Sequence, residues 1–270
     1  MTTLRAALCQ VASPSDPAGS LALVADPVAA AAGAGAQLAV LPEAAMARFG
    51  TPLAAVAQPL DGPWAQEVRR LAHAAGVVVV AGMFVPATDG RVHNTLLVTG
   101  PGVEDRYDKV HLFDAFGVRE SETVAPGSRL VTVDVAGVRV GLATCYDLRF
   151  PALFTALARS GAEVVVVPAS WGDGPGKAEQ WELVVRARAL DSTSWLLACD
   201  QAEPTTAGLE PVPGAAGGIG RSLAVSPLGE VRDRLGAAPG VLVVDVTTEE
   251  VAAARERLPV LQHARPLPGV

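Results

Sequence analysis

The stretch Val140-Gly-Leu-Ala-Thr-Cys145-Tyr-Asp-Leu-Arg149-Phe-Pro151 decides the fold and draws attention to one thiol. Its first residues form an apolar run typical of a buried strand, and Pro151 is typical of the first turn of a helix. A cysteine at such a junction lies near backbone amides that favour a thiolate and donate hydrogen bonds to a developing oxyanion. Cys145 is therefore a candidate nucleophile, although a lone cysteine at a strand end is more often structural.

Buried strands and helices alternate on both sides of this stretch. Short apolar runs bounded by turn residues predict strands, and longer segments that follow helix-start residues predict helices. The predicted strands of this kind are residues 4–11, 37–41, 77–80, 138–144, 163–167 and 194–199, and the predicted helices are residues 17–33, 63–75, 151–159, 177–191 and 247–257. On the helix at 177–191, the buried face is expected to carry Leu183, Val184, Ala187 and Leu190.

Hairpins interrupt this alternation. Asp89-Gly90 and Ala136-Gly137 predict tight turns between antiparallel strands, and residues 220–225 and 241–246 predict a second antiparallel set. Residues 112–129 have no clean period and predict a long loop, which is usually functional. Alternating strand-helix units combined with hairpins predict an α/β fold, namely a four-layer α-β-β-α sandwich with two mixed β-sheets. We expect one domain over residues 1–270.

The composition argues against several classes of partner. The net charge of −7 and the pI of about 5.1 are unlike a nucleic-acid-binding chain, which carries clustered lysine and arginine. The interval at residues 27–42, which has no Asp, Glu, Lys or Arg, contains a proline and a glutamine and falls short of a membrane span. No secretory signal precedes the first strand, so a cytoplasmic protein is expected. The cysteines and histidines lack ligand spacing, so neither a metal nor a cofactor is expected.

Two further residues can serve a cysteine nucleophile. Glu43 directly follows the predicted strand at 37–41, and Lys109 lies near the end of a strand predicted from residue 104. Hydrolysis of an amide by a thiol needs a base for the thiol proton, an acid for the leaving amine and a cation or amides for the oxyanion. A glutamate, a lysine and a cysteine supply that set, although each alone is more often an ordinary surface or structural residue.

These three residues lie in motifs that resemble a known family. Leu41-Pro-Glu43, Tyr107-Asp-Lys109-Val-His-Leu-Phe and Cys145-Tyr-Asp-Leu-Arg-Phe-Pro151 resemble, in order and spacing, the three signatures of the nitrilase (carbon-nitrogen hydrolase) superfamily. Residues 181–190, 220–229 and 258–263 also resemble it, so the likeness spans nearly the whole chain. Any one motif is weak evidence, but the three together are specific.

The resemblance implies a role for each residue. Glu43 is expected to be the general base, Lys109 the cation that stabilises the oxyanion, and Cys145 the nucleophile that forms a thioester acyl-enzyme. Glu120 matches the additional active-site glutamate of the family, with the expected role of orienting Lys109 or the substrate. The backbone amide of Tyr146 is the expected second oxyanion donor.

Within the superfamily, the cysteine motif and residues 258–263 resemble the branch of ω-amidases and deaminated-glutathione amidases. The implied substrate is a small amide that carries a carboxylate, such as α-ketoglutaramate or deaminated glutathione, with release of ammonia. Arg149 is expected either to bind that carboxylate or to pair with Asp147. Trp171 is expected to form an apolar wall of the pocket or to be a buried structural residue. Departures from the branch at Gln180, Arg221 and Ser226 bear on the substrate rather than on the reaction.

Other interpretations stay open from the sequence. A nitrilase or an N-carbamoyl hydrolase would use the same residues, and Cys145 with His111 would form the pair of a different thiol hydrolase. A catalytically silent, oligomeric interaction module is the alternative outside enzymes. The resemblance also implies a homodimer, because family members commonly pair through helices near the active-site face.

Overall fold

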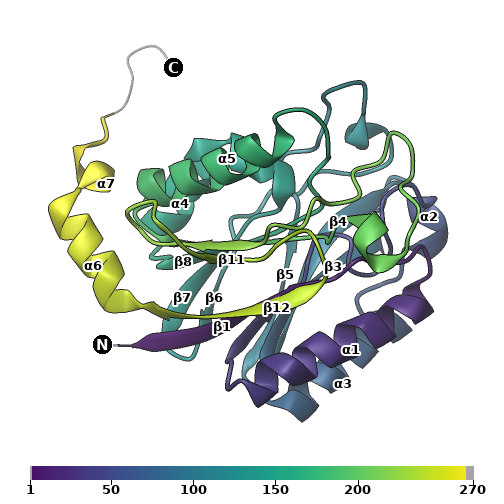
Figure 1. The fold of residues 1–270 in the computed structure, drawn as a ribbon, viewed down its shortest axis with the longest axis horizontal. Coiled ribbons are helices and arrows are strands. Elements are labelled where there is room, and N and C mark those ends of the chain that lie inside the picture. The colour runs from purple at the N-terminus through teal and green to yellow at the C-terminus, as the bar shows by residue number, and fades with distance from the viewer. Residues whose placement is uncertain (1, 266–270) are drawn as a thin grey trace.

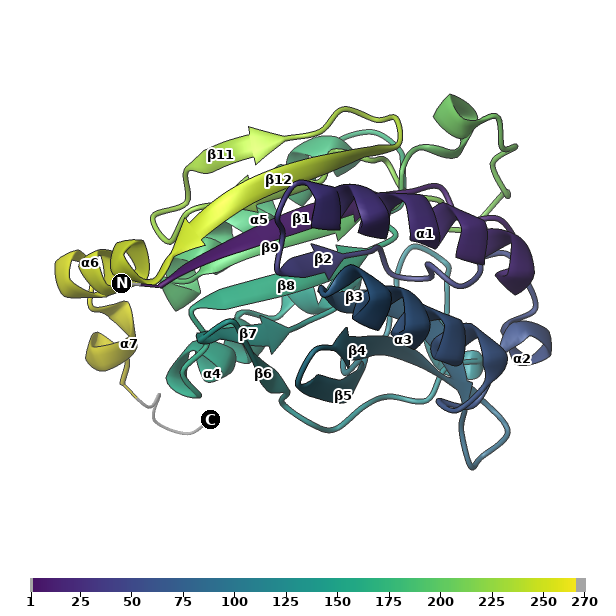
Figure 2. The same cartoon turned by 90° about the horizontal axis from the view of Figure 1, so that it is seen from below.

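Two six-stranded sheets pack face to face in the computed structural model, which describes residues 2–265 (Figure 1). The expected domain also includes residue 1 and residues 266–270, which lie outside this description. Helices α1 (Pro17–Gly33) and α3 (Pro63–Ala75) cover one sheet, and α4 (Pro151–Arg159) and α5 (Lys177–Ser192) cover the other (Figures 1 and 2). The predicted four-layer α-β-β-α sandwich is confirmed.

Both sheets have the same internal plan, with three parallel strands in the middle and antiparallel strands outside. The first sheet has the order β12-β1-β2-β3-β4-β5, and the second has the order β11-β10-β9-β8-β7-β6. The strands of the first sheet are β1 (Thr3–Gln10), β2 (Leu38–Val40), β3 (Val78–Pro86), β4 (Val92–Gly100), β5 (Val103–Asp108) and β12 (Gly240–Thr247). Those of the second are β6 (Thr132–Val135), β7 (Val138–Leu142), β8 (Val164–Ala169), β9 (Trp195–Asp200), β10 (Leu223–Val225) and β11 (Val231–Arg234).

Local signals in the sequence set the ends of the main helices. The Asp16 carboxylate caps α1 by accepting from the backbone N–H of Gly19 at 2.8 Å, and Pro17 occupies the first turn. Gly76 ends α3 with a positive φ of 67°, a conformation that glycine adopts without strain. The short helices are α2 (Leu53–Val56), α6 (Thr248–Arg257), α7 (Val260–His263), η1 (Glu120–Glu122), η2 (Cys145–Arg149) and η3 (Pro204–Ala207).

The core has three main layers of apolar side chains. One cluster lies between the two sheets, and the other two lie between each sheet and its helices. On β1, for example, Leu4 and Leu8 join the cluster between the sheets, whereas Ala7 and Cys9 join the cluster beneath α1 and α3. The central strands are covered on both faces, which explains why they are continuous apolar runs rather than alternating ones.

The predicted buried face of α5 is wrong for Leu183 and Leu190, whereas Val184 is half-buried and packs against the core as predicted. Trp181, Val185 and Ala189 are buried at successive four-residue intervals, while Leu183 and Leu190 are 66% and 40% exposed. Apolar residues occur around much of this helix, so the sequence pattern did not single out one stripe. The ring centroids of Trp181 and Trp171 are 5.3 Å apart, and this contact fixes the rotation of α5 about its own axis.

The predicted second antiparallel set is also partly wrong. Strand β12 pairs with β1 along eight residues and so belongs to the first sheet rather than beside β10. Strand β10 pairs with β9 and with β11, and the sequence did not suggest β11 because Arg232, Asp233 and Arg234 make it a polar, exposed edge strand. Strand β5 ends at Asp108, so Lys109 begins the loop that follows rather than lying within the strand.

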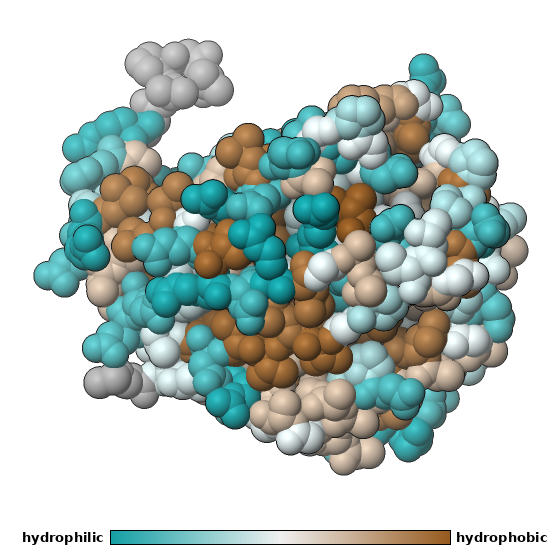
Figure 3. Space-filling view, viewed as in Figure 1, coloured by the Kyte–Doolittle hydropathy of each residue, from teal (hydrophilic) through white to brown (hydrophobic). Residues whose placement is uncertain are grey.

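Hydrophilic and hydrophobic residues lie side by side on the outer surface. On the face seen in Figure 3, the largest hydrophobic area lies where β12 borders α1, and Leu23, Pro27 and Val241 line a shallow hollow between these elements. None of the helices within residues 2–265 is long and apolar enough to cross a membrane.

Asp147 connects the two sheets beside the loops that follow β5 and β7. Its buried carboxylate accepts from the Tyr107 hydroxyl at 2.7 Å and from the backbone N–H of Thr144 at 2.8 Å. It also lies 2.6 Å from Nδ1 of His111 and accepts from the backbone N–H of that residue. Tyr107 lies in β5 of the first sheet and His111 in the loop after it, whereas Asp147 lies in η2 after β7 of the second sheet, so this carboxylate fixes the two segments against each other.

Replacing Asp147 should therefore destabilise the fold strongly. Asp147→Ala leaves several buried donors without an acceptor, and we expect the free energy of unfolding to fall by about 3–5 kcal/mol in urea titrations. Asp134→Ala is the matched control, because Asp134 pairs with Arg139 on the surface and should contribute at most about 1 kcal/mol. Equal effects of the two substitutions would contradict this assignment.

Candidate active site

A cavity of about 380 Å³ opens where loops from both sheets meet. Its lining comes from the loops after β2, β5, β7 and β8 and from residues 213–216. All seven residues singled out from the sequence line it, namely Glu43, Lys109, Glu120, Cys145, Tyr146, Arg149 and Trp171. The structure therefore brings together residues that are separated by more than 100 positions in the chain.

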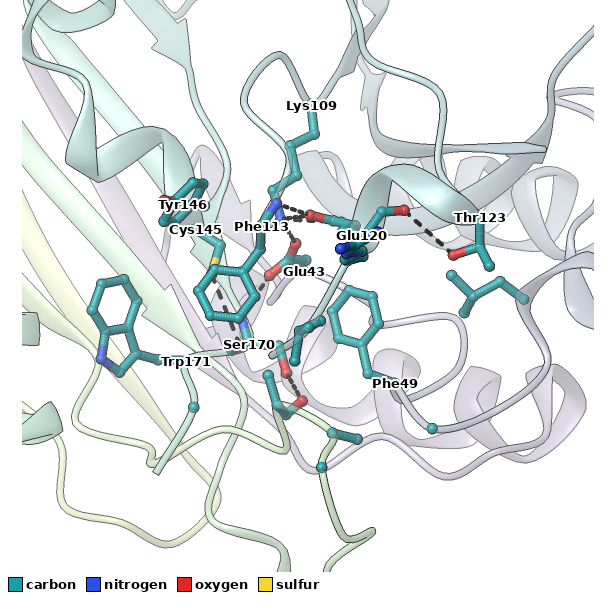
Figure 4. A pocket seen from close by; sticks show the side chains of 18 of the residues that line it. Glu43, Phe49, Lys109, Phe113, Glu120, Thr123, Cys145, Tyr146, Ser170 and Trp171 are labelled. Atoms are coloured by element: carbon teal, nitrogen blue, oxygen red, sulfur yellow. Dashed lines mark hydrogen bonds and ion pairs between the residues drawn. The ribbon is translucent and has the colours of Figure 1, made fainter. Parts of the chain in front are cut away.

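The Lys109 ammonium lies between two carboxylates at the base of this cavity (Figure 4). Its Nζ is 2.9 Å from Oε1 of Glu43 and 2.9 Å from Oε2 of Glu120. The Asn94 amide donates to both glutamates, at 2.7 Å to Glu43 and at 3.1 Å to Glu120. The Glu120 carboxylate also accepts from the backbone N–H of Phe113 at 2.7 Å. These four side chains form one buried polar cluster.

Burial, together with the excess of carboxylates over ammonium groups, shifts the pKa values of Glu43 and Lys109. Burial and the negative charge of Glu120 raise the pKa of Glu43, although Lys109 opposes the shift. Burial alone would lower the pKa of Lys109, but the charges of Glu120 and Glu43 outweigh it and hold that pKa well above its usual value. Lys109 is thus a permanent cation, and Glu43 is a carboxylate with an increased affinity for a proton.

Cys145 is held in an unusual backbone conformation beside this cluster. It is the first residue of η2 and has a φ of 44°, in the left-handed region that residues other than glycine rarely adopt. Its Sγ donates to the Ser170 carbonyl at 3.8 Å. Burial and the charge of Glu43 raise the pKa of the Cys145 thiol well above its usual value. The resting group is therefore a neutral thiol that needs a base to become a nucleophile.

The turn after β8 positions both Glu43 and Cys145. The Ser170 backbone N–H donates to Oε2 of Glu43 at 2.9 Å, while its carbonyl accepts from the thiol. The next residue, Trp171, donates its backbone N–H to the buried Asp200 carboxylate at 2.7 Å. Asp200 also accepts from the backbone N–H of Ile219 at 2.8 Å. Asp200 thereby fixes the turn that holds Glu43 beside the thiol.

Aromatic side chains form the walls of the cavity. Phe49, Phe113, Tyr146 and Trp171 surround the polar cluster in Figure 4. Trp171 is only 5% exposed, and its indole N–H donates to the Lys177 carbonyl at 3.0 Å. It is both a wall of the pocket and a buried structural residue, so the two sequence interpretations of Trp171 are compatible.

The structure bears on one of the two alternatives for Arg149, the ion pair with Asp147. Its Nη2 donates to the Gln180 side chain at 2.7 Å, and its guanidinium lies 5.3 Å from the centre of the Trp171 ring. The alternative ion pair with Asp147 is wrong, because that carboxylate binds Tyr107 and His111 instead. Arg149 lines the cavity and has a neutral partner, which leaves its charge available to a ligand.

The alternative Cys-His pair is not supported. His111 lies 2.6 Å from Asp147 through Nδ1, and its ring stacks on Phe150 at a centroid distance of 3.7 Å. The hydrogen bond of the Cys145 thiol goes to Ser170, and the charged groups that surround the thiol are those of Glu43 and Lys109.

Comparison with known proteins places the chain in a family. A family model described as carbon-nitrogen hydrolase matches residues 5–256. The chain belongs to the carbon-nitrogen hydrolase family. This membership confirms the resemblance drawn from the three motifs, and the family name establishes the reaction class as hydrolysis of a carbon-nitrogen bond.

Several members of this family are similar over most of their length. Hydrolase Rv0480c of Mycobacterium tuberculosis is 55% identical over 266 residues, which are 96% of this chain and 95% of that protein. The deaminated glutathione amidase of Escherichia coli O157:H7 is 36% identical over 84% of each chain. Omega-amidase NIT2 of Mus musculus is 29% identical over 98% of this chain and 96% of that protein.

A solved structure from the family is also similar. It is a glutamate-to-glutamine mutant of the amidase from Nesterenkonia sp. AN1, with the acetamide moiety of fluoroacetamide covalently added at its active-site cysteine. The TM-score is 0.79 at 26% identity, and the match covers 98% of this chain and 94% of that one.

Three other residues at the site of this carbon-nitrogen hydrolase were not found from the sequence as parts of it. They are Asn94, Asp200 and Lys177. Asn94 had a usable signal, because a polar residue inside an otherwise apolar strand has to find buried partners. The other two lie at the end of β9 and at the start of α5, where the sequence does not show which distant segment they face.

The electrostatics of the thiol can be tested directly. Because the pKa of Cys145 is raised above the ordinary 9.0, alkylation by iodoacetamide should reach half its maximal rate above pH 9. Glu43→Gln removes a negative charge next to the thiol, so the midpoint should move to lower pH, whereas Glu122→Gln on the exposed rim should leave it unchanged. A wild-type midpoint below pH 9, or no shift in Glu43→Gln, would show that this assignment is wrong.

Proposed function

We propose that this protein is a cysteine-dependent amidase that hydrolyses a small amide carrying a carboxylate and releases ammonia from a primary amide or an amine from an N-substituted one. The observation that carries the proposal is the convergence of Glu43 and Lys109 on Cys145 in one cavity. Membership of the carbon-nitrogen hydrolase family supports the reaction class, and the similarity to proteins named as amidases supports the choice of an amide.

In the first half of the reaction, Sγ of Cys145 attacks the carbonyl carbon of the amide as Glu43 takes the thiol proton. Negative charge then develops on the carbonyl oxygen, where Lys109 Nζ and the backbone N–H of Tyr146 stabilise it. Tyr146 is the second residue of η2, where backbone N–H groups have no partner within the helix. When the tetrahedral intermediate collapses, Glu43 gives its proton to the leaving nitrogen. Ammonia departs from α-ketoglutaramate, or the amine part departs from deaminated glutathione, and a thioester remains on Cys145.

In the second half, the same residues hydrolyse the thioester. Glu43 takes a proton from a water molecule, and the resulting hydroxide attacks the thioester carbonyl. Collapse of the second intermediate releases the carboxylic acid, and Glu43 returns the proton to the sulfur of Cys145. The raised pKa of Glu43 suits it to both directions of proton transfer, since the group must gain and lose a proton twice in each cycle.

Glu120 acts through Lys109 in this proposal. Its contacts with Lys109, Asn94 and the backbone of Phe113 hold the ammonium beside Glu43. Its negative charge also keeps Lys109 protonated and helps to raise the pKa of Glu43. The covalent adduct on the active-site cysteine of the Nesterenkonia amidase supports the corresponding role for Cys145.

The class of substrate is inferred from Arg149. Its cationic side chain faces the cavity with only a neutral amide as partner, and a guanidinium binds carboxylates with two parallel hydrogen bonds. An ω-amide such as α-ketoglutaramate or deaminated glutathione offers such a carboxylate. The names of the Escherichia coli and mouse relatives agree with this choice.

Activity measurements test the reaction. The purified protein should release ammonia from α-ketoglutaramate and the corresponding acid from deaminated glutathione, with loss of at least about a thousandfold in kcat for Cys145→Ala. Activity that survives Cys145→Ala would exclude the proposal. Turnover of nitriles or N-carbamoyl compounds in place of amides would assign the same residues to a nitrilase or a carbamoylase. No turnover of any of these would favour the catalytically silent module.

We also propose that the enzyme is a cytoplasmic homodimer. Leu183 and Leu190 are exposed seven residues apart on one side of α5, which suits burial against a second copy. The three cysteines are free, as is usual in a reducing compartment. Light scattering should give about twice the chain mass of 27.6 kDa, and a mass of one chain at micromolar concentration would contradict the dimer.

A further inference from the structure

Lys177 is a second lysine in the same cavity, and the function proposed above gives it no role. The sequence contains only two lysines, Lys109 and Lys177, while every other strongly basic side chain is an arginine. Both lysines line the cavity that contains Cys145. Lys177 is the first residue of α5, at the end of the loop that follows Trp171.

Folding stability does not explain a cation at this position. A positive charge at the first residue of a helix is opposed by the helix dipole, which favours anions there. The Lys177 ammonium lies 3.8 Å from the centre of the Phe116 ring, a side chain that is itself 75% exposed. Within residues 2–265, neither Lys177 nor Arg149 forms an ion pair with a carboxylate. Partial burial and the charge of Arg149 both lower the pKa of Lys177.

Trp171 holds the two cations on one wall of the cavity. Its ring lies against the Arg149 guanidinium, and its indole N–H donates to the Lys177 carbonyl. Arg149 is tied to α5 as well, because it donates to the Gln180 side chain. The Arg149 guanidinium and the Lys177 backbone are thus held on the same wall, and the two charges are close enough to repel. A ligand with negative charge on that wall would remove the repulsion.

The two cations pack against rings of very different exposure. Arg149 packs against Trp171, which is 5% exposed, whereas Lys177 packs against Phe116, which is 75% exposed. One carboxylate near the inner wall would face Arg149, and a second one nearer the mouth would face Lys177. The cavity of about 380 Å³ falls within the range that holds ligands larger than a minimal amide.

We infer that Arg149 and Lys177 form a subsite for two carboxylates, which makes the preferred substrate an amide with one carboxylate on the acyl side and another on the amine side. This inference deepens the proposed amidase function and rests on it for the reaction. Arg149 binds the inner carboxylate, and Lys177 binds the outer one. Lys177 is then the residue that separates peptide-like amides with two carboxylates from simple amides with one.

The first experiment compares two substrates of equal length. Both are amides of the γ-carboxyl group of α-ketoglutarate, one with glycine and one with ethanolamine, so that only the glycine conjugate carries the second carboxylate. The selectivity is the ratio of kcat/KM for the glycine conjugate to that for the ethanolamine conjugate, measured as formation of α-ketoglutarate. Lys177→Met should lower this ratio roughly tenfold, since a hydrogen bond to a charged group is lost.

Two other variants make the result specific. Lys177→Arg keeps the charge and should retain most of the selectivity. Arg159→Gln removes one positive charge from the exposed end of α4, outside the cavity, and should leave the selectivity unchanged. An equal loss for both substrates in Lys177→Met would overturn the inference, because it would show that Lys177 only holds Phe116 in place.

The second experiment measures binding without catalysis. In the Cys145→Ala protein, glutarate carries two carboxylates and butyrate carries one, so calorimetry should show tighter binding of glutarate, and Lys177→Met should remove that advantage. Isotope-labelled lysine gives only two side-chain signals by NMR, and glutarate should raise the pKa of Lys177 while leaving the Lys109 signal in place. Equal binding of glutarate and butyrate would overturn the subsite.

The two experiments separate this inference from the proposed function. If no amide is hydrolysed but glutarate binding still depends on Lys177, the subsite holds and the amidase assignment fails. If amides are hydrolysed with equal efficiency whether they carry one or two carboxylates, the amidase assignment holds and the inference about Lys177 fails.

Discussion

The burial of one ammonium between two carboxylates is the constraint on which the rest of the site depends. A buried charge is costly unless it is paired and hydrogen-bonded, and the Lys109 cluster has one positive and two negative groups. The remaining negative charge is accommodated by neutral donors, chiefly the Asn94 amide and the backbone N–H groups of Phe113 and Ser170. This imbalance leaves Lys109 permanently charged and gives Glu43 its raised affinity for a proton.

The fold supplies this arrangement at the ends of parallel strands. In α/β sheets, ligands bind beyond the carboxyl ends of the strands, and Glu43, Cys145 and Ser170 follow β2, β7 and β8 in that way. Two buried aspartates hold the loops in register. Asp147 ties η2 to the segment after β5, and Asp200 ties the turn after β8 to the loop before β10. The strained backbone of Cys145 persists because its neighbours are fixed on both sides.

Much of the fold and several residues that line the candidate site could be predicted because their signals are local. A strand followed at once by Glu43 or Cys145 is visible in a few residues, and the strand and helix boundaries follow from Asp16, Gly76 and Pro151. Features that depend on which distant segments pair could not be predicted in the same way. The pairing of β12 with β1 and the buried stripe of α5 are set by contacts between segments far apart in the chain. The same is true of Asn94, whose role appears only when β4 lies beside Glu43 and Glu120.

The account as a whole requires that the acyl group passes through the sulfur of Cys145. The most direct test is mass spectrometry of protein quenched in acid during turnover of an amide substrate, followed by peptide mapping. We expect an added mass equal to the acyl part of the substrate on the peptide that contains Cys145, and none on the peptides with Cys9 or Cys199, which are fully buried. Steady turnover with unmodified Cys145, or an adduct on either of the other cysteines, would contradict the account.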